Sequence, residues 1–148
     1  MAISIRPAQQ SDLSELLRLY QQLNPADPLP DRETADGVLL QMLENPMTRI
    51  LIALEDGHAV STCTLVIVPN LTRNLASYAV IENVVTDTAC RGRGAGKAVM
   101  NYAIEQAWEA GCYKVMLMTG KQRDNTVAFY GSLGFSAERK TGMEIRRP

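Results

Sequence analysis

Two spacing patterns of hydrophobic residues organise the first half of the chain. Ile3 and Ile5 alternate with polar neighbours and predict a short first strand. Apolar residues at helical spacing over 13–23, after the capping residue Ser11, predict an amphipathic helix, and a second helix begins at Asp31. Three apolar runs then predict strands, of which the first two are joined by an Asp-Gly hairpin turn: 49–55, 58–68 and 78–86.

In the second half, the apolar period changes from two residues to 3.6. The pattern predicts a helix over 94–110 ended by Gly111, a strand over 114–118, a short helix over 125–133, and a last strand or hairpin arm within 135–146. Hairpins in the first half and a strand–helix–strand crossover in the second predict an α/β (α+β) fold. We therefore expect a mixed sheet with helices on both faces.

Size, charge and cysteine content narrow the class of protein. The chain has 148 residues, the usual size of one domain, so we expect a single domain over 1–148. Its formal net charge of −1 gives no general attraction to nucleic acid or to an acidic membrane. No apolar segment approaches the ~20 residues that span a bilayer. With three widely spaced cysteines and one histidine, we expect no disulfide framework, no metal and a cytoplasmic location.

The segment 91–97, Arg-Gly-Arg-Gly-Ala-Gly-Lys, joins a predicted strand to a predicted helix. Its glycines let the backbone approach a ligand closely, and the free N–H groups of a helix's first turn attract an anion. Arg91, Arg93 and Lys97 concentrate positive charge in a nearly neutral chain. We therefore expect an anion site here. The alternative is a tight structural turn with solvated arginines.

Two common phosphate-binding patterns fit this loop poorly. The P-loop needs a glycine at position 91 and a hydroxyl at position 98, where the chain has Arg91 and Ala98. The dinucleotide fingerprint fits Gly92 and Gly94 but needs a small residue in place of Lys97. It also needs an acidic residue near the end of the next strand, and 114–118 has none.

Two motifs together resemble the GCN5-related N-acetyltransferase (GNAT) family. Arg91-x-x-Gly94-x-Gly96 matches its [Q/R]-x-x-G-x-[G/A] signature, and the segment 128–135, Ala-Phe-Tyr-x-x-x-Gly-Phe, is similar to its second characteristic region with a shortened lead-in. The resemblance implies a mostly antiparallel sheet of six to seven strands, about four helices, and central parallel strands that splay apart. It implies acetyl-CoA as cosubstrate and a small-molecule primary amine as acceptor.

The resemblance also assigns a cofactor site. It implies that the pyrophosphate lies on the backbone of the glycine loop, and that the pantetheine arm pairs with the end of the strand over 78–86. Asn125 either caps the short helix or bonds the pantetheine. The implied cofactor-binding residues are Val84, Val85, Thr86, Arg91, Gly92, Arg93, Gly94, Ala95, Gly96, Lys97, Asn125 and Tyr130.

Acetyl transfer to an amine needs a base, because an alkyl amine with a pKa of about 10.4 is mostly protonated at neutral pH. Glu82, a charge within an apolar run, is the first candidate, directly or through water. Alternatively, Glu82 faces solvent or pairs with an arginine. An N–H near Val84 would stabilise the oxyanion. Tyr130 stands at the family's general-acid position; the alternative is a core aromatic beside Phe129 and Phe135.

Three segments, 81–85, 111–115 and 144–147, resemble the glucosamine-6-phosphate N-acetyltransferase branch more narrowly. That branch carries an acidic residue where Asn83 stands, so this amino sugar is one acceptor among several alternatives. The branch also implies a homodimer as an option. Two other functions are a non-catalytic acyl-CoA-binding or regulatory module on the same fold and a nucleotide-binding βαβ protein. The presence of both Glu82 and Tyr130 favours the enzyme.

Overall fold

The computed structural model describes residues 2–120 and 124–148. The chain divides into two compact units, 1–116 and 117–148, and α4 below belongs to the second. Within the described ranges, no helix has the length and apolar character needed to cross a bilayer. The elements follow the predicted order: β1 (Ile3–Pro7), η1 (Gln10–Asp12), α1 (Leu13–Leu23), α2 (Arg32–Glu44), β2 (Thr48–Glu55), β3 (His58–Val68), β4 (Tyr78–Thr86), η2 (Thr88–Cys90), α3 (Ala95–Glu109), β5 (Val115–Met116) and α4 (Asp124–Ser132).

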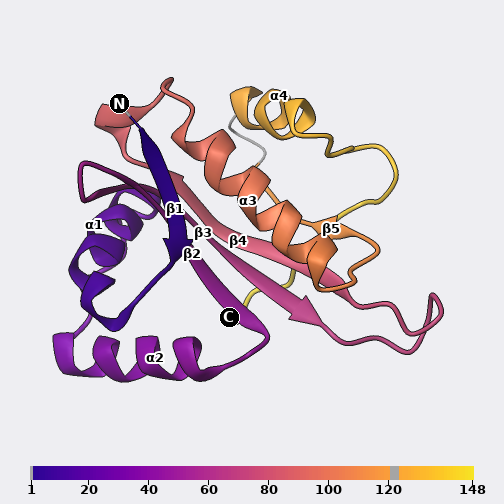
Figure 1. Cartoon of the computed structure of the whole chain (residues 1–148), viewed down its shortest axis with the longest axis horizontal. Helices are drawn as coiled ribbons and strands as arrows, with labels where there is room; N and C mark the ends of the chain where they lie inside the picture. The colour runs from indigo at the N-terminus through magenta and orange to yellow at the C-terminus, as the bar shows by residue number, and fades with distance from the viewer. Residues whose placement is uncertain (1, 121–123) are drawn as a thin grey trace. The chain divides into compact units, whose positions relative to one another are not determined.

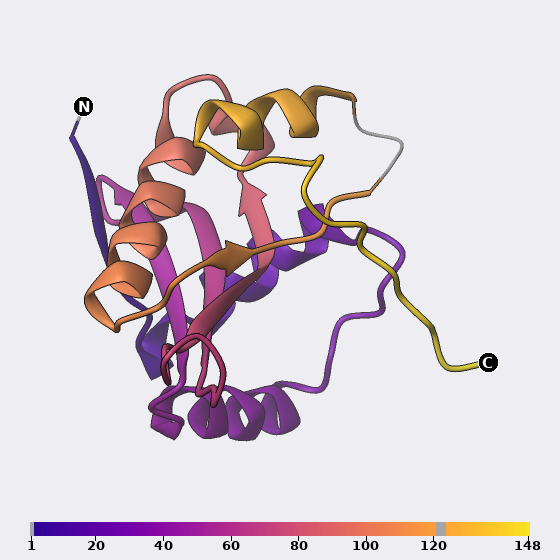
Figure 2. The same cartoon turned by 90° about the vertical axis from the view of Figure 1, so that its right-hand side faces the viewer.

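The strands of the first unit form one mixed sheet in the order β1-β2-β3-β4-β5. The first four strands are antiparallel to their neighbours, and β5 is parallel to β4. Helices α1 and α2 cover one face of this sheet and α3 covers the other (Figures 1 and 2). Because both faces of the central strands are covered, β2 and β3 are buried at consecutive positions rather than at alternate positions.

A hydrophobic core lies on each face of the sheet. On the face covered by α1 and α2, Leu19 packs in one cluster with Ile50 and Ile52 of β2. On the opposite face, Val99 of α3 is fully buried, and its carbonyl lies 4.0 Å from Cys63 Sγ on β3. Burial raises the pKa of the Cys63 thiol to about 12, so this cysteine stays protonated and belongs to the core.

The starts of the two helices agree with the sequence at α2 and correct it at α1. Asp31, where the second helix was predicted to begin, is the N-cap of α2, and its side chain accepts a hydrogen bond from the first turn. Ser11, however, is exposed within η1, and Asp12 is the N-cap residue of α1 instead. Asp12 accepts from the Gln9 amide at 2.7 Å and from two nitrogens of Arg6 at 2.7 and 3.0 Å. The sequence pattern placed the cap one residue too early, because serine and aspartate are about equally favoured at an N-cap and the pattern does not separate Ser11 from Asp12.

The sheet has five strands where six to seven were expected. The predicted last strand within 135–146 is absent from the described structure, and β5 covers two residues of the expected 114–118. In the last segment, Met143 and Ile145 alternate with polar neighbours, which suggested a strand, yet they are 88% and 98% exposed. Two alternating apolar residues bury too little surface to stabilise an added strand.

Candidate functional site

The glycine loop lies between the end of β4 and the start of α3. Gly92 and Gly94 have φ values of 79° and 88°, in the left-handed region that side chains rarely adopt. Gly94 is the N-cap of α3 and has no side chain to cap it, so the first-turn amides point outward without a side-chain acceptor. The loop therefore presents free N–H groups at a helix N-terminus, as the sequence predicted.

The three cations of the loop are not equivalent. Arg93 Nη1 lies 3.4 Å from Glu55 Oε2 at the end of β2. Among the described residues, Arg91 and Lys97 have no acidic partner, and both are exposed. Two cations of the loop, rather than three, are thus available to an anion. The sequence could not show the Arg93 ion pair, because it joins segments that are distant along the chain.

The parallel ladder between β4 and β5 stops early. It pairs Ala79 with Val115 and Val80 with Met116, and then ends. From Ile81 to Thr86, β4 has ladder partners on its β3 side only, among the described residues of the first unit. The edge of β4 that leads to the glycine loop therefore carries backbone groups able to pair with an extended ligand.

A β-bulge interrupts this part of β4. Thr62 of β3 lies opposite Val85 and Thr64 opposite Glu82, so two residues of β4, Asn83 and Val84, face a single residue of β3. Asn83 has a φ of 53°, which asparagine tolerates better than most residues. The bulge leaves the Asn83–Val84 backbone out of the regular ladder, an arrangement common beside active sites. Alternation of apolar residues did not predict it.

Glu82 and Asn83 are consecutive and both exposed, which a regular strand would not allow. Glu82 has no ion-pair partner among the described residues, so the ion-pair alternative is not what the structure shows. Its carboxylate reaches solvent on the face of the sheet that Thr64 also faces. Its role as the base stays a prediction.

Tyr130 lies in α4, in the second unit. Its ring makes edge-to-face contacts with Phe129 and Phe135, at centroid distances of 5.1 and 6.0 Å. The Phe135 amide donates to the Tyr130 carbonyl at 3.1 Å just beyond the end of α4, beside Gly134 (φ 101°). The aromatic contacts fix the ring, and they are compatible with either role proposed for Tyr130. Asn125 lies inside the first turn, because α4 begins one residue earlier than predicted.

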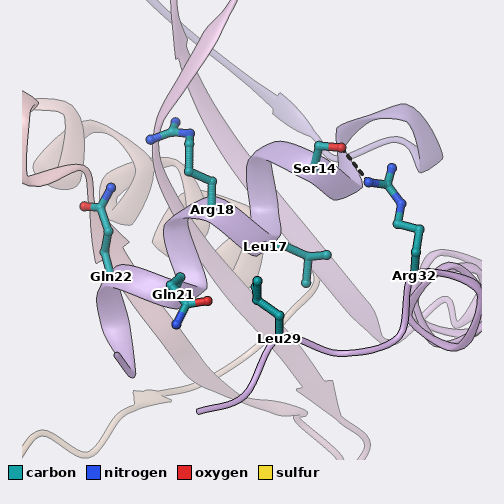
Figure 3. Close-up of a pocket in the computed structure, with 7 residues that line it drawn as sticks. All are labelled: Ser14, Leu17, Arg18, Gln21, Gln22, Leu29 and Arg32. Carbon is teal, nitrogen blue, oxygen red and sulfur yellow. Dashed lines mark hydrogen bonds between the residues drawn. The ribbon is translucent and has the colours of Figure 1, made fainter. Parts of the chain in front are cut away.

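A groove of about 530 Å³ lies beside α1 and was not predicted (Figure 3). Arg32 of α2 donates to Ser14 of α1 at 2.7 Å across it. The groove combines two guanidinium groups, two amides and a hydroxyl with an apolar floor. Its lining residues are Ser14, Leu17, Arg18, Gln21, Gln22, Leu29 and Arg32. The described residues contain no cluster of three or more side chains that could hold a metal ion.

Comparisons with known proteins place the chain in a family. Residues 13–135 match the model of the Acetyltransferase (GNAT) family. The chain belongs to the GNAT family. It is 33% identical to the glucosamine 6-phosphate N-acetyltransferase of Trypanosoma brucei brucei over 97% of this chain and 96% of the relative. It is therefore an acyltransferase, of a family that uses acetyl-CoA.

Two solved structures share the GNAT fold of this chain. A protein from Agrobacterium tumefaciens str. C58, described as an acetyltransferase without a named acceptor, is 51% identical with a TM-score of 0.94, covering 97% of this chain and 99% of that one. A transcriptional regulator from Bacillus halodurans C-125 is 26% identical with a TM-score of 0.91, covering 99% and 100%. The family resemblance read from the two motifs is thus confirmed.

Proposed function

We propose that this GNAT protein moves the acetyl group of acetyl-CoA to the primary amine of a small molecule, with an amino sugar such as glucosamine 6-phosphate as the first acceptor to test. The observation that carries the donor is the junction of β4 and α3. There, a strand edge without a ladder partner in the first unit leads, through the short turn η2, into a loop of free amides at a helix N-terminus. An extended amide-bearing arm followed by a pyrophosphate matches that succession.

Each proposed catalytic group has a separate role. Glu82, exposed on β4, takes a proton from the acceptor ammonium, directly or through water, so that the amine can attack the thioester carbonyl carbon. A backbone N–H at the Asn83–Val84 bulge donates to the oxyanion that forms. The C–S bond then breaks, Tyr130 donates its phenolic proton to the departing thiolate, and the nitrogen that was attached to the carbonyl carbon loses its second proton to water. The amide product and free CoA result, Glu82 releases its proton to bulk solvent and Tyr130 regains one from it, so that one proton is released overall.

The resemblance to the Trypanosoma brucei brucei enzyme supports the amino-sugar acceptor, because the match extends over nearly the whole of both chains. Asn83 argues against a simple transfer of that substrate. The enzyme branch carries an acidic residue at this position, and here the bulge exposes a neutral amide. An acceptor other than glucosamine 6-phosphate is therefore a second candidate of the same reaction class.

The deciding experiment is a turnover screen with acetyl-CoA as donor. Release of free CoA thiol is followed with glucosamine 6-phosphate, glucosamine, amino acids, polyamines and aminoglycosides as acceptors. We expect turnover with at least one amine, and an amino sugar to give the highest kcat/KM. Binding of acetyl-CoA without turnover on any class would support the non-catalytic module. Absence of acetyl-CoA binding would refute the cofactor site itself.

A further inference from the structure

Helix α1 holds the segment that precedes the glycine loop through two side chains. Arg18 Nη1 donates to Asp87 Oδ2, immediately after β4. Gln22, one turn further along α1, accepts from the Thr88 amide at 2.9 Å through its Oε1. Figure 3 shows both side chains leaving α1 away from Leu17 and Leu29. Arg18 and Gln22 thus reach, from one helix, two successive residues of the path that leads from β4 to the glycine loop.

Arg18 is bonded to three separate parts of the first unit. Its Nε donates to Glu15 at 2.7 Å and its Nη2 donates to the Ala59 carbonyl at the start of β3 at 2.6 Å, in addition to Asp87. Only the planar guanidinium offers donors in such a fixed fork. The three acceptors lie on α1, on β3 and after β4, and together they restrict the guanidinium to one orientation. The ion pair with Asp87 is therefore held in place by the other two hydrogen bonds.

Asp87 in turn forms hydrogen bonds that restrain the turn preceding the glycine loop. Its Oδ1 accepts from the Ala89 amide at 3.0 Å and caps η2, while its own amide donates to the Val60 carbonyl at 2.8 Å. The Cys90 amide donates to the Asp87 carbonyl at 2.8 Å. The pKa of Asp87 is lowered by the Ala89 amide and by the Arg18 guanidinium, which keeps it ionised. Arg91 and the first loop glycine follow this anchored turn directly.

Arg18 also offsets an unfavourable charge. Asp87 is an anion close in sequence to a loop that would bind a pyrophosphate, and like charges at short range weaken anion binding. The guanidinium neutralises Asp87 and anchors it at the same time. The Arg93–Glu55 ion pair ties the middle of the loop to the end of β2 in a similar way. Contacts with α1 and β2 therefore restrain the segment just before the loop and the middle of the loop.

We propose that Arg18 and Gln22 are positioning residues for the cofactor loop: α1 fixes the backbone from Asp87 to Arg91 so that the loop amides face the cofactor pyrophosphate. This inference rests on the proposed function, since it assumes that the loop binds CoA. Neither residue needs to touch the cofactor. Their effect is to fix beforehand a loop whose glycines would otherwise allow many conformations.

The test compares four proteins: wild type, Arg18→Gln, Gln22→Ala and a matched control, Arg6→Gln. Arg6 also makes a bidentate pair with an aspartate at α1, but its partner Asp12 lies at the other end of the helix from the loop. The Kd for CoA is measured by calorimetry, and amide hydrogen exchange is measured for peptides that cover 86–97. Thermal unfolding of each variant gives its loss of stability.

We expect Arg18→Gln to raise the Kd for CoA on the order of tenfold and Gln22→Ala about two- to fivefold, as for the loss of a charge-assisted and a neutral hydrogen bond. Exchange of the 86–97 amides rises in both variants. Arg6→Gln keeps the wild-type Kd and loop exchange even though it is destabilised. At saturating acetyl-CoA, kcat of Arg18→Gln stays close to wild type, because only the cofactor KM depends on the loop.

Two results would overturn the inference. Wild-type affinity for CoA in folded Arg18→Gln and Gln22→Ala shows that α1 does not position the loop. An equal loss of affinity in Arg6→Gln shows that general destabilisation, not this contact, sets the affinity. Failure of wild-type protein to bind CoA is a different outcome, because it removes the proposed cofactor site before α1 is tested. If Arg18→Gln does not fold, Gln22→Ala and the loop-exchange measurement still decide.

Discussion

Thr62 and Thr64 are neighbours on the same face of β3, and only one of their two buried hydroxyls is hydrogen-bonded. Thr62 Oγ1 donates to the Leu51 carbonyl at 2.7 Å. Thr64 Oγ1 has no hydrogen-bond partner of acceptable geometry among the described residues, although the side chain is only 5% exposed. A valine at either position keeps nearly the same shape and removes the hydroxyl. The two substitutions should therefore change stability in opposite directions.

The magnitudes follow from the hydrogen-bonding state of each hydroxyl. Loss of the bonded Thr62 hydroxyl costs about 1 kcal/mol, the net value of one hydrogen bond. Loss of the unbonded Thr64 hydroxyl removes a buried polar group whose desolvation costs about 1–3 kcal/mol, so Thr64→Val should be more stable than wild type by about 1 kcal/mol or more. The two variants should then differ by about 2 kcal/mol, or roughly 4–8 °C in Tm.

Urea unfolding followed by circular dichroism measures both free energies of unfolding, and an unchanged m value shows that the unfolded state is comparable. A Thr64→Val protein less stable than wild type would refute the reasoning. It would mean that the hydroxyl is satisfied, most directly by Tyr20. Burial raises the pKa of Tyr20, and the hydroxyls of Thr64 and Thr62 partly offset that shift, so the phenol lies near both. A double-mutant cycle with Tyr20→Phe measures any such coupling.

The remaining predictions concern the loop, the chemistry and acid stability. Gly94→Ala should lose about 1–2 kcal/mol of stability and bind CoA more weakly, because a φ of 88° is strained for alanine even though no atom lies within 4 Å of the new methyl group. Gly37→Ala within α2 should instead be stabilised, and urea unfolding of both variants checks this. Tyr130→Phe should lower kcat more than it changes acetyl-CoA affinity, and an unchanged kcat removes Tyr130 from the mechanism. Asn83→Asp should raise kcat/KM for glucosamine 6-phosphate relative to other amines, and an unchanged ratio argues against that acceptor. The pKa of Asp12 is lowered, chiefly by the hydrogen bond from its partner Arg6. Its stabilising effect is therefore full above the pKa of the unfolded state and is lost as the pH falls through the lower pKa of the folded state. In Asp12→Asn, the free energy of unfolding should fall less steeply than in wild type below about pH 4.

The sequence was sufficient for features that depend on neighbouring residues. The period of the apolar residues predicted the four α-helices of the described residues and the first four strands, but not the short 3-10 helices η1 and η2, and Gly92 and Gly94 stood where the backbone needs positive φ. The features it could not predict depend on residues that meet only after folding. Arg18 and Asp87 are 69 positions apart, and no local pattern marks either as the partner of the other. The bulge at Asn83 is similar, because a strand and a bulged strand have nearly the same apolar alternation.

The predicted last strand failed for the same physical reason. Met143 and Ile145 show the alternation of a strand, but a strand forms only where a neighbouring edge and a buried face are available to it. In the first unit, β1 to β4 obtain both from antiparallel neighbouring strands and from the helices on each face. Local pattern therefore predicts strand propensity, while the number of strands depends on which edges the rest of the fold provides.

The early end of the β4–β5 ladder distinguishes the proposed pyrophosphate site from the phosphate sites of nucleotide-binding folds. In such folds, parallel strands stay paired up to the phosphate loop, and the ligand lies outside their carboxyl ends. Here the pairing of β4 with β5 ends at Val80. The edge of β4 from Ile81 to Thr86, about 20 Å of strand, has no ladder partner among the described residues of the first unit, and it leads through η2 to the glycine loop. A ligand that matched only the loop would leave that edge unused. A ligand with amide groups along an extended arm would pair with the edge and place its pyrophosphate at α3, so we expect the protein to bind CoA in preference to ATP or NAD.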